Sequence, residues 1–160
     1  MGKNKYESLI RSIELSNIEL QDLSCQRNNN LSSEKKSNLQ VGLQHEIVEQ
    51  FHDSLDYVVH THFNVSAFHS EEDDKELAEH SINNENTLFT INFTLESTYK
   101  VDIANIDHDL EAYKEEFKLF SKRNVPINIW PYAREIISSI TTRMGFPPLI
   151  IPTNKNVTPF

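Results

Sequence analysis

The segment NIWPYAREIISSITTRMGFPPLIIPTN, residues 128–154, contains residues that favour the start and the end of a helix, followed by an apolar extended tail. Pro131 suits a first helical turn, because its missing N–H has no partner to lose there. Gly145 is a natural stop, and the Pro147-Pro148 pair prevents continuation. The pattern therefore predicts a helix that follows Trp130 and ends at Gly145. Its apolar residues recur at spacings of three and four and share one stripe: Ile129, Ala133, Ile136, Ile137, Ile140 and Met144.

A shorter helix is expected just before this segment. Asp107 or Asp109 can cap its start, and the basic pair Lys122-Arg123 at its end matches the helix dipole. The stretch Val125–Ile129 would then link the two helices. The apolar positions of the shorter helix are Leu110, Tyr113, Phe117 and Phe120.

Before the helices, apolar residues recur at every second position. Between residues 57 and 68, and again between 89 and 96, apolar and polar residues alternate as in half-buried strands. A further strand is expected within Ile13–Cys25, and His52-Asp53-Ser54 resembles a hairpin turn between strands at 40–51 and 55–69. Such short connections leave no room for crossover helices, so the strands should pair antiparallel. This order, with the strands before the helices, predicts an α+β fold: a four-stranded antiparallel sheet with two C-terminal helices packed on one face.

Length and composition point to one domain, residues 1–160. Two polar segments break the strand pattern and are expected to be loops. Residues 26–38 are rich in Asn, Ser and Lys, and residues 70–86 carry seven acidic residues against one lysine. The role of the acidic loop is left open.

Charge and hydropathy exclude several classes of partner. A net charge of −9 argues against nucleic acid, which requires a basic face. No apolar run approaches the ~20 residues that a membrane span requires. The first 20 residues lack the hydrophobic region of a signal peptide, and the single cysteine, Cys25, favours a reducing compartment. A cytoplasmic protein is expected.

No catalytic constellation is evident, and the chain is not expected to be an enzyme. Three glycines cannot build a phosphate-binding loop, and nothing near Cys25 would activate its thiol. His60 and His62 share one face of a strand and could together bind a metal ion, although no spacing identifies a third ligand. A polar sheet face explains that pair equally well, so no metal and no cofactor are assigned. Arg134 and Glu135 are read as an ion-pairing residue and a helix-start acid.

The segment 128–154 resembles the C-terminal core of the SecB family of export chaperones. Pro131-Tyr132-Ala133-Arg134-Glu135 is similar to the start of that family's helix, and Gly145-Phe146-Pro147 to its exit. Before residue 128, the chain resembles the family only in the order of its expected elements: four strands with a long loop after the first, then a short helix. The insertion at 70–86 and the short stretch 155–160 after the motif differ from the best-known export chaperones.

The resemblance implies an ATP-independent holdase that binds unfolded or non-native polypeptides in apolar grooves for export. It also implies a homotetramer, built as a dimer of dimers. The best-known members engage a SecA-type motor, and some SecB-like proteins protect a single antitoxin instead. A dedicated chaperone of one such partner is thus the first alternative, and a His-rich metal- or small-molecule-binding protein is the second.

A holdase needs exposed apolar surface, and the C-terminal segment offers the best candidates. One sequence does not separate groove residues from interface residues, because both sites favour the same apolar types. The expected groove walls are Val125, Ile127, Ile129, Trp130, Tyr132, Phe146, Leu149 and Ile150. The expected oligomer-interface or helix-core residues are Ala133, Ile136, Ile137, Ile140 and Met144.

Overall fold

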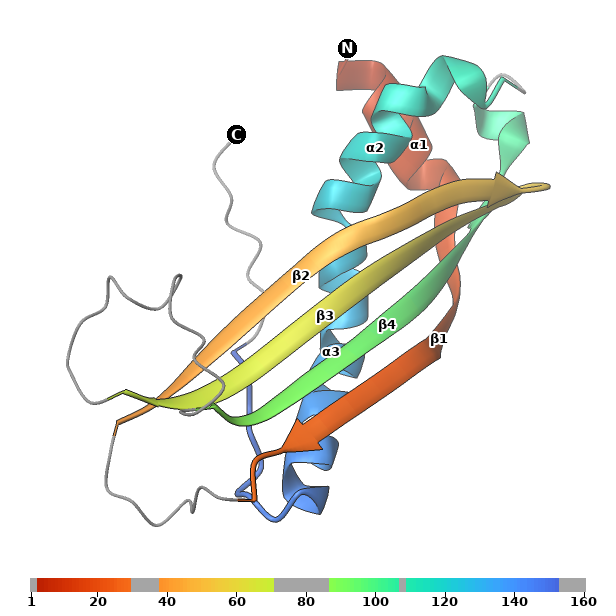
Figure 1. Cartoon of the computed structure of the whole chain (residues 1–160). Coiled ribbons are helices and arrows are strands. Elements are labelled where there is room, and N and C mark those ends of the chain that lie inside the picture. Colours follow the sequence, from red (N-terminus) through yellow and green to blue (C-terminus); the bar gives the residue numbers. More distant parts are fainter. Residues whose placement is uncertain (1–2, 30–37, 71–86, 107–108, 153–160) are drawn as a thin grey trace.

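Four long antiparallel strands form one sheet in the order β1–β4–β3–β2, and helices cover one of its faces (Figure 1). The computed structural model describes residues 3–29, 38–70, 87–106 and 109–152. The elements follow in chain order: α1 (Lys3–Ser12), β1 (Ile13–Arg27), β2 (Asn38–Asp53), β3 (Asp56–Ser70), β4 (Thr87–Val101), the 3-10 turns η1 (Ile103–Asn105) and η2 (Glu111–Tyr113), α2 (Lys114–Arg123) and α3 (Val125–Arg143). The predicted four-stranded sheet with two C-terminal helices is confirmed.

The central strands β3 and β4 form the core with alternate side chains. The odd-numbered residues from Tyr57 to Ala67 and from Phe89 to Val101 are buried toward the helices. Phe63 and Phe93 are paired across the two strands and stack with ring centroids 4.8 Å apart. The even-numbered side chains form the opposite, largely polar face, as the alternation predicts.

Two β-bulges divide β1 into three segments. The pairing with β4 shifts between Leu15 and Asn17, and again between Leu20 and Asp22. Each extra residue reverses the alternation of side chains, so the apolar residues of all three segments keep to the helix-covered face. Those residues are Ile13, Leu15, Ile18, Leu20 and Leu23.

The long helix begins earlier than expected. α3 starts at Val125, with Pro126 in its first turn, and Pro131 lies inside the helix. The prediction that residues 125–129 form a link and that the helix follows Trp130 is therefore wrong. Pro131 removes one helical hydrogen bond, but the extra turns bury Val125, Pro126, Ile129 and Trp130 against the sheet, which outweighs that loss. The predicted stop is confirmed, because Gly145 has the positive φ of 86° that ends the helix.

The shorter helix α2 differs at its start. Asp109 caps the 3-10 turn η2, since its Oδ1 accepts from the amides of Glu111 (3.1 Å) and Ala112 (3.3 Å), and α2 proper begins only at Lys114. Its predicted apolar positions Phe117 and Phe120 are buried. Asn124 alone separates α2 from α3.

Helix α1 was not expected from the sequence. Leu9 is fully buried, and the Tyr6 hydroxyl donates to Oδ1 of Asn124 at 2.7 Å. These contacts attach α1 to the junction of α2 and α3. The segments expected as loops, 26–38 and 70–86, lie mostly outside the described residues, although residues 26–27, 38 and 70 belong to strands.

Candidate functional site

An apolar groove lies between β1 and the N-terminal half of α3. It has a volume of about 470 Å³ and opens to solvent. Leu20 and Tyr132 are 46% and 49% exposed, which is high for residues on the helix-covered side of the sheet. We call it the β1–α3 groove. Its lining residues are Ile18, Leu20, Leu95, Pro131, Tyr132, Glu135 and Ile136.

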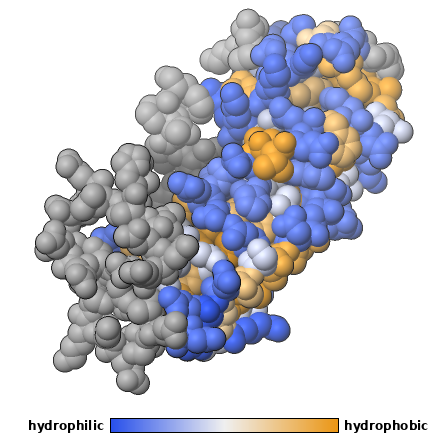
Figure 2. All heavy atoms as spheres, viewed as in Figure 1, coloured by the Kyte–Doolittle hydropathy of each residue, from blue (hydrophilic) through white to orange (hydrophobic). Residues whose placement is uncertain are grey.

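The groove continues along an open sheet edge. β1 pairs only with β4, so its outer main-chain edge has no strand beside it in the described chain. Leu15 and Leu23, on the same face as Leu20, are 37% and 39% exposed. Figure 2 shows hydrophobic residues along this side of the molecule, whereas the outer sheet face is mainly hydrophilic. An apolar edge of this length is a surface that proteins normally cover.

A second apolar region lies on the other side of α3, toward β2. The Trp130 ring lies 5.6 Å from the ring of His45 and 6.2 Å from that of Phe63, centroid to centroid. Its Nε1 donates a hydrogen bond of 2.6 Å to the carbonyl oxygen of Pro152. Trp130 thus joins α3, β2 and the extended chain that follows α3.

That extended chain, Phe146–Pro152, is here called the strap. It turns back beside α3 behind the sheet (Figure 1). Phe146 and Ile151 are buried, with 8% and 3% exposure, while Ile150 is 69% exposed. Leu149 is half-buried against the core. The strap therefore covers part of the apolar surface and presents one isoleucine to solvent.

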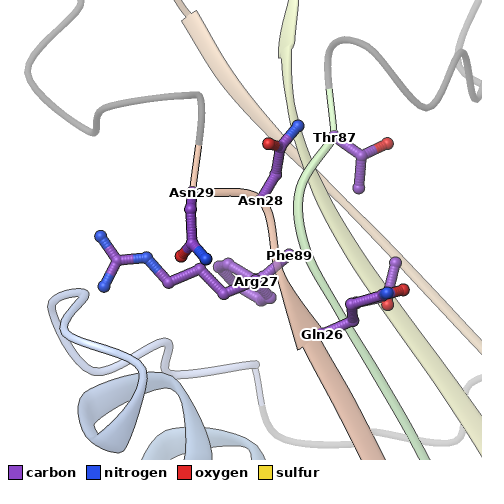
Figure 3. A pocket seen from close by; sticks show the side chains of 7 residues that line it. Gln26, Arg27, Asn28, Asn29, Thr87 and Phe89 are labelled. Carbon is purple, nitrogen blue, oxygen red and sulfur yellow. The ribbon is translucent and has the colours of Figure 1, made fainter.

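The end of α3 is attached to the end of β1 through Arg27. Nη1 of Arg27 donates to the carbonyl oxygen of Met144 at 2.6 Å, and the guanidinium lies 4.9 Å from the centre of the Phe146 ring. Phe146 also packs on Phe89, with ring centroids 5.1 Å apart. Figure 3 shows Arg27 pointing away from Thr87, at the border of a cavity of about 520 Å³. This cavity is more polar than the β1–α3 groove. Its lining residues are Gln26, Arg27, Asn28, Asn29, Thr87, Phe89 and Thr90.

The structure divides the predicted groove residues into three groups. Val125 and Ile129 are fully buried core residues. Trp130 is buried beneath the strap, and Phe146 is buried at the start of the strap. The exposed or half-buried ones are Ile127 (45% exposed), Tyr132, Leu149 and Ile150. Among the predicted interface or helix-core residues, Ala133 and Ile137 are fully buried, and Ile136, Ile140 and Met144 pack partly buried against the core.

Several residues of these surfaces were not predicted as groove or interface residues from the sequence. Leu20 and Leu95 line the β1–α3 groove, and His45 contacts Trp130. The alternation of Ile18 and Leu20 with polar neighbours indicated a strand, but not that the strand lies at an open edge.

The histidine pair lies on the polar outer face. Nε2 of His60 is 2.7 Å from a carboxylate oxygen of Glu96, and Nδ1 is 3.4 Å from one of Glu49. Nδ1 of His62 is 3.1 Å from the Thr94 hydroxyl. Within the described ranges, no three His, Cys, Asp or Glu residues come together as metal ligands. Both imidazoles therefore have protein partners on this face.

The two histidines of β2 that face the helices predict a pH dependence. Partial loss of water lowers the pKa of His45, beside Trp130, and of His52, whose ring lies 4.5 Å from that of Phe117. For His52, the charge of Glu111 opposes part of this shift. Because the unfolded chain binds these protons more readily, the free energy of unfolding should fall as the pH drops below about 6.5.

Urea unfolding at pH 7.5 and at pH 5.5 measures this effect. Replacing both residues, His45→Gln and His52→Gln, should reduce the loss of stability between the two pH values. An unchanged loss would show that other groups cause it. His62→Gln, on the outer face, is the matched control.

The four antiparallel strands and the helices on one face define the class: an α+β protein with exposed apolar surface on both sides of its long helix. The family model described as "Preprotein translocase subunit SecB" matches residues 8–154, and the chain belongs to the SecB family. The family predicted from residues 128–154 is thus confirmed. No helix in the described part of the chain has the length and apolar character needed to cross a membrane.

Two relatives are similar to this chain. A "Protein-export protein SecB" of Anaplasma phagocytophilum (strain HZ) is 35% identical over 49 residues, which is 31% of either chain. The chain therefore matches less than a third of that curated relative. A solved SecB-like chaperone of Mycobacterium tuberculosis, in complex with a peptide from the HigA1 antitoxin, superposes with a TM-score of 0.74. The superposition covers 99% of this chain and 100% of the other at 15% identity, which shows a shared fold.

Proposed function

We propose that this protein is an ATP-independent holdase that binds extended, non-native polypeptides on the β2 side of α3. The observation that carries the proposal is the apolar region around Trp130, which is covered by an extended segment rather than by a strand or helix. Leu43 and Ile47, half-buried on the same face of β2 as His45, continue this region. The outer main-chain edge of β2 could accept an extended client as an added strand.

We assign the β1–α3 groove to a second copy of the chain. An uncovered apolar edge of this length would cause aggregation, so it needs a partner that is always present. A second copy meets that requirement, whereas a client binds only transiently. We propose a homotetramer, formed as a dimer of dimers, and the membership of the chain in the SecB family supports this. Tyr132 and Ile136 then belong to the subunit interface, and Trp130, Leu43 and Ile47 to the client side.

Suppression of aggregation tests the holdase function. A chemically denatured client, diluted into buffer without nucleotide, should remain soluble when about one tetramer per client chain is present. The measurement is light scattering over time with several unrelated clients. Aggregation of every client at the unprotected rate would contradict a general holdase.

A dedicated chaperone of one partner is the second candidate. The Mycobacterium tuberculosis protein with the same fold is solved with an antitoxin peptide, which favours this alternative. Protection of a single antitoxin from aggregation, with no effect on unrelated clients, would select it. We further propose a cytoplasmic location, no enzymatic activity and, for an export role, a SecA-type motor as partner. Co-sedimentation with purified SecA tests the last point.

A further inference from the structure

We propose that the strap is an internal ligand of the client site, and that a client must displace Leu149–Pro152 to bind. This inference rests on the proposed function, because it concerns how the same site is regulated. The strap has the properties of a client segment: it is uncharged, extended and apolar, with the sequence FPPLIIP. It covers the surface that a non-native polypeptide would otherwise occupy.

The contacts of the strap allow its release. Among the described residues, no backbone-to-backbone hydrogen bond attaches residues 147–152 to the rest of the chain. Ile151 is buried at 3% exposure, and the Trp130 indole donates to the Pro152 carbonyl. Two aliphatic side chains, the buried Ile151 and the half-buried Leu149, and one hydrogen bond thus attach this end. An extended client with aliphatic side chains can reproduce these contacts.

The other end of the strap is attached more firmly. Phe146 packs on Phe89 and under the guanidinium of Arg27. Pro147 and Pro148 restrict the chain that follows. Displacement would therefore move Leu149–Pro152 away from Trp130 while Phe146 stays in place.

These contacts also specify the chemistry of the client. The strap offers Trp130 a main-chain carbonyl oxygen and places a branched aliphatic side chain in the core. Three of its seven residues are prolines and have no N–H to donate. A client should therefore need an aliphatic residue followed by an accessible carbonyl oxygen, and should tolerate proline beside it.

Ile151→Ser tests the inference, and Ile150→Ser is its matched control. The two neighbours have the same side chain, but Ile151 is buried and Ile150 is 69% exposed. Trp130 is the single tryptophan, so its fluorescence reports the environment beneath the strap. Ile151→Ser should shift the Trp130 emission to the red, and Ile150→Ser should not.

The tryptophan-free peptide FPPLIIP, added in trans, provides the first binding arm. It should return the emission of Ile151→Ser toward that of the wild type. It should also bind this variant about tenfold or more tightly than the wild type, because the weakened strap competes less. A red shift without tighter binding of the peptide would overturn the inference: the strap would then be only a structural part of the core.

A permanently unfolded client, reduced and carboxymethylated α-lactalbumin with a fluorescent label, provides the second arm. Tighter binding to Ile151→Ser than to the wild type supports the inference, and equal binding overturns it while leaving the holdase function intact. If the client binds neither the wild type nor the variant, the proposed function is contradicted. The experiment with the peptide still decides the role of the strap. If Ile151→Ser does not fold, a chain that ends at Pro148 replaces it, with a chain that ends at Pro152 as control.

Discussion

Leu20→Asp is expected to dissociate the assembly. Leu20 is 46% exposed in the β1–α3 groove, and in the proposed dimer a second copy covers it. A carboxylate there would lose its water without gaining a partner. An apolar side chain at the centre of an interface contributes about 2 kcal/mol or more to the binding free energy. The dissociation constant of the dimer should therefore rise about 30-fold or more. Light scattering coupled to size-exclusion chromatography, over a range of protomer concentrations, measures the change in mass.

Ser24→Asp is the matched control for that variant. Ser24 lies on the same strand and pairs with Asn92, whose side chain belongs to the polar outer face. The same added charge should leave the mass unchanged at this position. An intact assembly in the Leu20→Asp variant would contradict the assignment of the β1–α3 groove to a second copy and would make the groove available to clients.

Phe93→Ala is expected to lower the free energy of unfolding by about 3–5 kcal/mol, as for other buried aromatic residues. Phe93 is fully buried and stacks on Phe63 with an interplanar angle of 6°. The substitution removes this contact and leaves a cavity between the sheet and α3. Urea unfolding at a fixed protomer concentration measures the loss, since assembly adds to the apparent stability.

Phe93→Leu separates volume from specific packing. It retains most of the apolar volume and should cost less than about half as much as the alanine variant. Combining Phe63→Ala with Phe93→Ala should cost less than the sum of the two single variants, because the two rings share one contact. Strict additivity would show that the stacked pair is not a coupled unit.

The fold was largely predictable because its signals are local. Alternation in β3 and β4 and the apolar stripe of α3 follow directly from one buried face. The start of α3 was missed because Pro131 is a strong local signal for a helix start, and only the tertiary burial of Ile129 and Trp130 overrides it. Helix α1 was missed because its packing on Asn124 is a long-range contact.

The residue types of the candidate site could be chosen from the sequence, but its geometry could not. Trp130, Tyr132 and Ile150 were identified as apolar candidates, and the structure places Trp130 and Tyr132 on opposite sides of α3. That separation follows from where the helix crosses the sheet, which no local pattern encodes. Leu20 was not considered as a site residue, because whether a strand lies at an edge depends on the pairing order of the whole sheet.

The two bulges of β1 have a consequence for how this edge can associate. β1 uses fifteen residues, with Ser16 and Gln21 unpaired, and a strand with such insertions bends and twists more than its neighbour. A flat edge can add strands of any length without limit, as in amyloid fibrils. A bent edge can match only a partner of similar curvature. The bulges thus allow the exposed leucines of β1 to contact one partner of matching curvature, while open-ended polymerisation is disfavoured.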